Sequence, residues 1–297
     1  MSPRRFLLIS RIGPESLHPQ WLAPAAERDF DLLLSAYSSD VTAPESQPGV
    51  FFEYRRGRKV AGYGEIIRDH RQLIAGYDYV ALFDDDLAIE ARELSRLFRI
   101  IADHKLKIAQ PALDHASFFT YGCLLRHKAF LLRYTTYVEM MCPVFRSDIL
   151  MMLEPLFQMG FESGIDLIWS GLVHDGARDF AVIDACPVRH TRRVGTLKAS
   201  NGFGAGKPYE HDIHAILDRF GAPWLPCLPY AAIRRSGRYT QSRLAMMAAA
   251  ATLLFAIPRH IPIKWRLRNI AVYWHHLLRR SPTNARIAWP AGLAAGR

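Results

Sequence analysis

The sequence predicts an α/β protein whose sheet is flanked by helices and followed by a basic helical segment. Short apolar runs alternate with helix-like stretches over the first 190 residues, which is typical of a layered fold with a largely parallel sheet. Half of the 297 residues are hydrophobic, which excludes a disordered chain. The longest apolar run, residues 244–257, has 14 residues and is too short for a transmembrane helix.

The elements are expected where the apolar spacing changes between helical and strand-like. Residues 78–83 form a compact apolar run that ends in three consecutive acids, and Gly76 stops the helical pattern before it. Pro111 predicts an edge position or an interruption for the strand that contains it. In order, the expected elements are a strand at 6–12, a short helix within 14–28, a strand at 30–38, a helix at 59–75, a strand at 78–83, a helix at 87–102 and a strand at 108–113.

Charge divides the chain into two parts. All 28 Asp and Glu residues lie at or before Asp218, whereas 13 of the 38 Lys and Arg residues follow it. We therefore predict a folded body over 1–218 and a basic helical C-terminal extension over 219–297, with helices at 244–257 and 265–280. Basic residues among apolar ones suit an anionic membrane surface. The alternatives are packing on the body or in a homo-oligomer, and nucleic acid, for which the extension has no recognisable reading motif.

The cysteines and the N-terminal residues bear on the cellular compartment. Cys123, Cys142, Cys186 and Cys227 form no CxxC pair and are interpreted as reduced thiols. The apolar run at 6–10 is too short for a signal peptide and is interpreted as part of the first strand. We expect a cytoplasmic protein, peripheral at the inner face of the membrane if the extension binds lipid.

The most informative segment is the acidic run Asp84, Asp85 and Asp86, which directly follows the strand at 78–83. Side chains alternate along an extended chain, so the first and third acid point the same way and Asp85 the other way. Neighbouring carboxylates repel one another unless a cation lies between them. A divalent metal such as Mg²⁺ or Mn²⁺, carrying a diphosphate, is the simplest compensation. The alternative is that these acids cap the helix expected from residue 87.

Two chemistries use a strand that ends in Asp-x-Asp. In nucleotide-sugar transfer the acids hold a metal and the ribose; in aspartyl-nucleophile phosphatases the first acid, here Asp84, is phosphorylated. The second chemistry normally has Thr or Val where this chain has Ala88, and its strand usually lies near the start of the chain. Both points favour sugar transfer.

Five short segments between about residues 77 and 197 occur in an order and at a spacing that can be compared with those of a protein family. They are Tyr77–Leu87, Ile108–Asp114, Val138–Phe145, Gly164–Leu167 and Val182–His190, with Gly195–Leu197 behind the last. Together they resemble a family of unknown function from plants and bacteria, sometimes labelled as related to lysine-ketoglutarate reductase, which is similar to GT-A-type glycosyltransferases.

The resemblance implies a GT-A-like mixed sheet over 1–218 and a metal-dependent glycosyltransferase. The donor would be a nucleoside-diphosphate sugar and the acceptor a saccharide or a lipid-linked glycan. It also implies that Asp84 contacts the ribose or the metal, that Asp86 binds the metal, and that His190 is the last metal ligand. The metal would be Mn²⁺ or Mg²⁺, and an imidazole ligand favours Mn²⁺. Taken alone, a single histidine such as His190 is more often structural.

The resemblance further implies a catalytic base. Asp166 resembles the acid that lies under the acceptor, where it would deprotonate the attacking hydroxyl. Glu162 stands in a stretch where the family often has Trp-Gly, and it is a rival base. A structural role at the start of a helix is the alternative for Asp166, and Glu139 is either an acceptor contact or a buried structural partner.

The remaining candidate donor contacts are Lys59, Asp85 and Lys207. Lys59 precedes the helix that leads to the acidic strand, and a solvated role is its alternative. The glycine-rich segment 201–208 departs from a phosphate loop in its glycine spacing and in having Pro208 for the hydroxyl residue. We interpret it as a lid whose Lys207 reaches the diphosphate. A membrane- or partner-binding protein that keeps the fold without the chemistry is the remaining alternative.

Overall fold

The computed structural model describes residues 4–22, 27–173, 176–193, 195, 208–224, 228–256, 262–279 and 286–293. The strands are β1 (Phe6–Ile12), β2 (Phe30–Ala36), β3 (Val50–Tyr54), β4 (Tyr79–Asp84), β5 (Leu87–Ala88), β6 (Ile108–Leu113), β7 (Phe130–Thr135), β8 (Val144–Arg146), β9 (Phe180–His190), β10 (Pro229–Arg234) and β11 (Tyr239–Thr240). The α-helices are α1 (Lys59–Asp69), α2 (Arg71–Ala75), α3 (Ala91–Asp103), α4 (Ser147–Phe157), α5 (Trp169–Val173), α6 (Tyr209–Phe220), α7 (Arg243–Ala251), α8 (Leu253–Ala256) and α9 (Ile263–Arg279). Three short 3-10 helices complete the set, η1 (His18–Trp21), η2 (Gly122–Leu124) and η3 (Ile165–Leu167).

The strands form one mixed sheet in the order β11-β10-β7-β9-β6-β8-β4-β1-β2-β3, with β5 paired to β9 beside it. β3, β2, β1 and β4 are parallel. β8 lies antiparallel between β4 and β6, and β9 is parallel to β6 but antiparallel to β7. The predicted α/β class, a mixed sheet flanked by helices, is confirmed. The expectation of a largely parallel sheet holds only for the half that contains β1 to β4.

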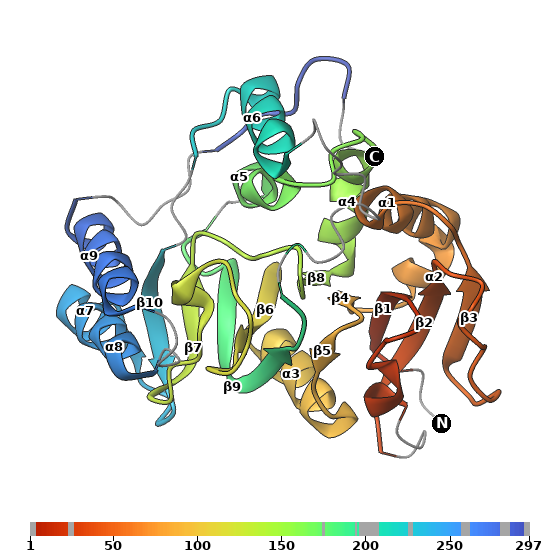
Figure 1. Ribbon diagram of the computed structural model, residues 1–297, viewed down its shortest axis with the longest axis horizontal. Helices are drawn as coiled ribbons and strands as arrows, with labels where there is room; N and C mark the ends of the chain where they lie inside the picture. Colours follow the sequence, from red (N-terminus) through yellow and green to blue (C-terminus); the bar gives the residue numbers. More distant parts are fainter. Residues whose placement is uncertain are drawn as a thin grey trace.

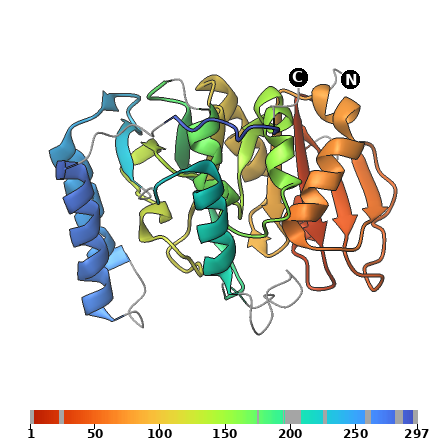
Figure 2. The same ribbon diagram turned by 90° about the horizontal axis from the view of Figure 1, so that it is seen from above.

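Helices cover the sheet because the side chains of its central strands are mostly apolar and are buried on both faces. β1 and β6 are buried along their whole length, which requires a covering layer on each side. Figure 1 shows α1, α4, α5 and α6 above the strands and α3 below them, with α7, α8 and α9 together at the left-hand end beside β10. Figure 2 shows the same lateral order from above, from α9 at the left to the β2 and β3 strands at the right.

Pro111 lies in the interior of the sheet, so the predicted edge position is wrong. β6 pairs with β8 on one side and with β9 on the other. The β8 pairing involves only Ile108 and Ala109, and the β9 register shifts between Pro111 and Leu113. The proline is tolerated because β8 is too short to reach it and because the register shift follows it, which is the interruption that the sequence predicted.

Three predicted helices differ from those in the structure. Within 14–28 the described residues form only η1. The helix expected at 59–75 is divided at His70 into α1 and α2. The helix expected from residue 87 begins at Ala91, because Leu87 and Ala88 form β5. The acidic run is therefore too far from α3 to cap it, and the capping interpretation is wrong.

The C-terminal extension contains strands as well as helices. β10 adds to β7 at one end of the sheet, and β11 pairs with β10. The helix expected at 244–257 is divided at Thr252 into α7 and α8, and the one expected at 265–280 is α9. None of the described helices combines the length and the apolar character that a bilayer-spanning segment requires.

A buried ion pair joins β7 to β9 in the half of the sheet next to the extension. Arg133 Nε lies 2.8 Å from Asp184 Oδ2, and Arg133 Nη2 lies 3.0 Å from Asp184 Oδ1. The side chains are 1% and 0% exposed. The same guanidinium donates to the carbonyls of Cys123 and Leu125, so it also holds the η2 segment against the sheet. Such bidentate geometry satisfies the fork of the guanidinium.

We predict that Asp184→Ala destabilises the protein by about 3–5 kcal/mol, because it leaves the Arg133 charge buried and uncompensated. Urea unfolding followed by circular dichroism measures the change, and Asp218→Ala at an exposed position is the control. The double replacement Arg133→Met with Asp184→Leu removes both charges and should recover only part of the loss, because the two carbonyls bound by Arg133 and the N–H of His127 lose their partners. A single variant as stable as the control would contradict the structural role of the pair.

Candidate active site

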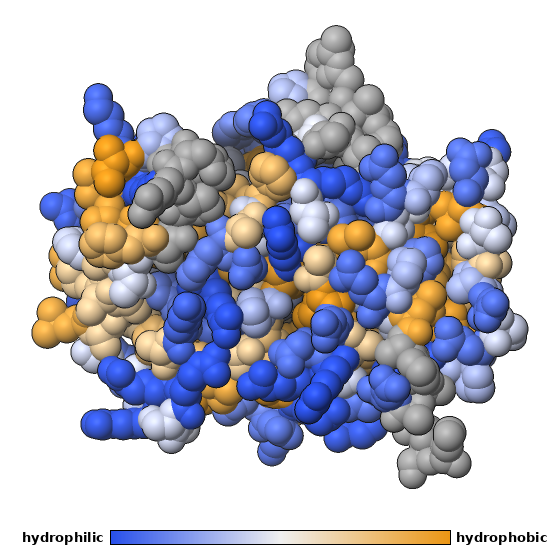
Figure 3. Space-filling model, turned by 60° about the horizontal axis from the view of Figure 1, so that its bottom comes forward, coloured by the Kyte–Doolittle hydropathy of each residue, from blue (hydrophilic) through white to orange (hydrophobic). Residues whose placement is uncertain are grey.

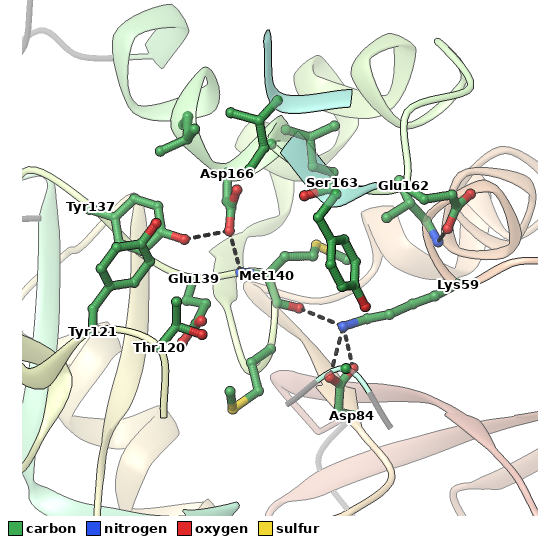
Figure 4. A pocket seen from close by; sticks show the side chains of 18 of the residues that line it. Lys59, Asp84, Thr120, Tyr121, Tyr137, Glu139, Met140, Glu162, Ser163 and Asp166 are labelled. Carbon is green, nitrogen blue, oxygen red and sulfur yellow. Dashed lines mark hydrogen bonds and ion pairs between the residues drawn. The ribbon is translucent and has the colours of Figure 1, made fainter. Parts of the chain in front are cut away.

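A pocket of about 480 Å³ opens where β4 ends in the acidic run. In sheets of this kind the carboxyl ends of parallel strands are where ligands bind. Figure 4 shows Lys59 and Asp84 on one side of the pocket and Tyr137 and Asp166 on the other. The pocket therefore has acidic groups on two facing walls, and ion pairs compensate the acids at the wall of Asp84 and Asp86.

Lys59 and Asp84 form an ion pair on the first wall. Lys59 is the first residue of α1, and its Nζ lies 2.6 Å from Asp84 Oδ1 and 2.8 Å from Oδ2. Nζ also donates to the carbonyl of Met140, 3.3 Å away. Burial raises the pKa of Asp84 to about 6, although the charge of Lys59 opposes this. The structure thus brings the predicted site residues Lys59 and Asp84 together in an ion pair with one another.

Asp85 points away from the pocket, as predicted, although it lies in a turn after β4 and not in an extended segment. Its Oδ2 accepts from the backbone N–H of Gly13 at 2.8 Å, and its Oδ1 lies 2.8 Å from Arg192 Nη2. A Cβ at Gly13 would lie 2.0 Å from the Tyr37 hydroxyl, so a larger residue here would force the Tyr37 ring to move. Asp85 is not among the residues that line the pocket. Its predicted contact with the donor is therefore replaced by a structural role, because its oxygens are bound to the β1 loop and to Arg192.

Asp86 and His190 meet at the floor of the pocket. β5 pairs with the end of β9 so that Leu87 lies opposite His190, which brings the imidazole to the acidic run. His190 Nε2 lies 3.1 Å from Asp86 Oδ2, and Nδ1 lies 2.8 Å from the carbonyl of Phe118. Because a carbonyl only accepts, Nδ1 carries a proton and Nε2 is the atom directed at the carboxylate. Burial opposes charge on both groups, yet their mutual attraction lowers the pKa of Asp86 and raises that of His190.

Asp86 and His190 have some of the features expected of ligands to a divalent cation. Asp86 Oδ1 is buried and has no hydrogen-bond partner among the described residues, and the Nδ1 bond of His190 is the usual support for a metal-binding Nε2. Within the described ranges, however, no three His, Cys, Asp or Glu side chains converge as a metal site. Asp84, the third predicted ligand, is turned to Lys59 instead.

Arg192 supplies positive charge that the sequence analysis missed. It follows His190 by two residues, binds Asp85 through Nη2, and has Nε 3.7 Å from Asp86 Oδ2. Arg192 also lines the pocket. Its place on the same side of the chain as His190 was a usable signal, but the pairing of β5 with β9 that brings it to the acids was not predictable from spacing.

The second wall presents Asp166 in a fixed orientation. Asp166 Oδ2 accepts from the Tyr137 hydroxyl at 2.6 Å and from the backbone N–H of Met140 at 3.2 Å. The acid lies in η3, which begins directly after Gly164, and the φ of +87° at Gly164 strongly favours glycine. Burial raises the pKa of Asp166, and the bond from Tyr137 limits the rise. Tyr137 was not recognised in the sequence, because its role depends on a contact across 29 residues.

Glu139 is the least compensated acid of the pocket. It lines the pocket on the side of Tyr137 and Asp166 (Figure 4), and its Oε2 is buried without a hydrogen-bond partner in the described part of the chain. Burial raises the pKa of Glu139 to about 7, and the nearby charge of Asp166 adds to the rise. The side chain is 8% exposed. The sequence left an acceptor contact and a buried structural role open for Glu139, and the structure places this residue in the lining of the pocket.

Glu162 and Lys207 complete the predicted set. Glu162 lines the pocket, but its two oxygens accept from the backbone N–H groups of Val60 and Ala61, at 2.8 and 3.1 Å. It thereby satisfies the free N-terminal amides of α1, which reduces its suitability as a base. Lys207 and the predicted lid lie outside the described residues, except for Pro208.

The chain is similar to a family of known sequences over part of its length and to solved structures over most of it. Residues 68–133 match a family described as "Protein of unknown function (DUF707)", a stretch that includes the acidic run. No curated protein matches the chain significantly. A solved structure described as "Crystal structure of S. aureus TarS 1-349" is similar with a TM-score of 0.46 and 11% sequence identity, over 92% of this chain and 90% of that chain.

We predict that Glu139 makes stability depend on pH between about 4.5 and 7. A carboxyl group with a raised pKa in the folded state costs no stability at low pH, where it is protonated in both the folded and the unfolded protein. As the pH rises toward the raised pKa, the unfolded state ionises more readily, so the folded state loses stability. The wild type should therefore lose up to about 3 kcal/mol relative to Glu139→Gln across this window. Urea unfolding of both proteins at several pH values measures the difference.

The exposed Glu45→Gln is the matched control for this measurement and should leave the pH profile of stability unchanged. A Glu139→Gln protein whose profile runs parallel to that of the wild type would show that this carboxyl group is not buried in the way described.

Proposed function

We propose that the protein is a glycosyltransferase that moves a sugar from a nucleoside-diphosphate sugar to a hydroxyl acceptor. The observation that supports this most is the pocket itself. On one wall an acidic run meets cationic groups at the end of a strand, and on the facing wall buried carboxyl groups have raised pKa values. Transfer of a sugar needs both, since a diphosphate must be stabilised as it leaves and a hydroxyl must lose its proton as it attacks.

The diphosphate would lie at the first wall. Lys59 and Arg192 line this side of the pocket and can donate to phosphate oxygens. Asp86 and His190 are the residues that would hold Mn²⁺ or Mg²⁺, with remaining ligands from the donor. A bound cation there would add charge neutralisation for the leaving diphosphate. In this proposal Asp84 positions Lys59 and contacts the ribose, while Asp85 anchors the run to the β1 loop.

The acceptor would lie at the second wall. Asp166 is the proposed base, because the Tyr137 hydroxyl and the Met140 N–H hold one of its oxygens and stabilise its charged form. Glu139 is now the alternative candidate for the base in place of Glu162, because the Glu162 carboxylate is bound to the first amides of α1. Tyr137 positions Asp166. The phosphatase alternative gains no support, because both oxygens of Asp84 are bound to the Lys59 ammonium, which makes it a poorer nucleophile.

Donor binding tests the first wall. Isothermal titration calorimetry with Mn²⁺ and a panel of nucleoside-diphosphate sugars should find one donor that binds the wild type. Asp86→Ala should weaken this binding by at least about tenfold, since it removes a charge that holds the cation. Asp103→Ala, at an exposed position in α3, is the matched control. Unchanged donor affinity in Asp86→Ala, or no binding of any donor to the wild type, would contradict the proposal.

Turnover of the donor tests the second wall. Asp166→Asn should lower kcat by about 10²- to 10⁴-fold while the KM for the donor stays nearly constant, because the base acts on the acceptor. Glu139→Gln should lower kcat much less. The reverse order of the two losses would assign the base to Glu139, and two equal small losses would remove the base from this wall.

A further inference from the structure

The outward side of the C-terminal helices carries an unusual amount of exposed apolar surface. Seven of the eleven large hydrophobic side chains that are exposed in the described residues lie within α7, α8 and α9. Leu244 and Phe255 are 78% and 86% exposed. Figure 3 shows hydrophobic surface gathered at the left-hand end of the molecule, where Figure 1 places these helices. We define the outer face as Leu244, Phe255, Ile263, Leu267, Trp274 and Leu278.

The outer face is a second apolar stripe on helices that already bury a first one. On α9 the buried residues include Ile270, Tyr273 and Leu277, which pack toward the sheet side. Ile263 and Leu267 are spaced by one helical turn, as are Trp274 and Leu278, so the exposed residues form a stripe of their own. A helix of a protein in water needs only the first stripe. The second therefore requires a partner or an apolar environment.

The exposed stripes of the two helices meet. Trp274 Nε1 donates to the carbonyl of Met247 in α7 at 2.9 Å. Arg243 Nη1 donates to the carbonyl of Leu278 at 3.5 Å. The start of α7 thus lies beside the end of α9, and the exposed residues on both sides of this seam belong to one continuous surface.

Positive charge borders the outer face. Lys264, Arg268 and Arg279 are exposed on α9 next to the apolar stripe, and Arg243 is exposed at the start of α7. The sequence contains no Asp or Glu after Asp218. The apolar stripe is therefore bordered by cations and no acid from the same segment.

We propose that the outer face docks the protein on an anionic lipid bilayer, with the apolar stripe among the acyl chains and the basic residues at the head groups. Helices with this division between apolar and basic faces lie in the plane of the membrane interface. A second copy of the chain is a poorer occupant, because two such faces would bring like charges together. Nucleic acid would bind the basic residues but leave the apolar stripe exposed to water.

Vesicle binding tests this inference independently of the enzyme activity. Sedimentation of the full chain with vesicles of phosphatidylcholine and phosphatidylglycerol should show a partition coefficient at least about tenfold higher than with phosphatidylcholine alone. Added salt should weaken the binding. The charge variant Lys264→Glu with Arg268→Glu should lose this preference, whereas Arg92→Glu with Arg189→Glu, an equal change at exposed positions elsewhere, should keep it.

A second pair of variants tests the apolar contribution without affecting the core. Leu244→Gln with Phe255→Gln should lower the partition coefficient severalfold, and Phe51→Gln in β3, at the other end of the sheet, should not. Equal binding to both kinds of vesicle, or none, would overturn the proposal. So would a charge variant that behaves like its control, tight binding of duplex DNA without vesicle binding, or a dimer that the same variants dissociate.

Discussion

Three adjacent carboxylates at the end of β4 require positive charge, and the structure supplies it from distant parts of the chain. Lys59 comes from the start of α1, 25 residues earlier, and Arg192 comes from beyond β9, 107 residues after Asp85. His190 completes the set. Without these partners the carboxylates would repel one another at a partly buried site and would protonate. The relative positions of α1, β4 and β9 are therefore coupled to the charge balance of one tripeptide.

The need to compensate these carboxylates explains several contacts between distant elements that hydrophobic packing alone does not require. The β5–β9 pairing places His190 opposite Leu87 and so holds the imidazole against Asp86. The Glu162 carboxylate fixes the first amides of α1, which also fixes the origin of the Lys59 side chain. Each of these contacts joins elements that are separate in the sequence. The pocket therefore forms only when these separate elements are assembled around the sheet, and no single sequence motif defines it.

The sequence was sufficient for the parts that depend on local pattern. The apolar run of β4 and its acidic end follow directly from the local sequence, and the predicted orientation of Asp85 agrees with the structure although Asp85 lies in a turn after the strand. The positions of β1 and β2, and most of α3 and α9, also follow from spacing.

What the sequence could not provide were contacts between distant elements. Pro111 is tolerated in the interior of the sheet because β8 has only three residues and does not pair with it. The partnership of Lys59 with Asp84, and that of Tyr137 with Asp166, depend on how loops cross the end of the sheet. The position of Lys59 before the helix that leads to the acidic strand suggested a donor contact, and nothing in the local sequence identified Asp84 as its partner.

The addition of β10 to β7 has a consequence for shortened forms of the protein. A chain cut at the charge boundary after Asp218 would lack β10, and β7 would become an unpaired edge strand. Phe130 in β7, which packs in a cluster with Ala232, Met246 and Tyr273, would lose its covering side chains. Free strand edges with apolar neighbours are templates for intermolecular pairing. Fragments ending there would aggregate, and during synthesis the sheet cannot be completed until β10 has left the ribosome.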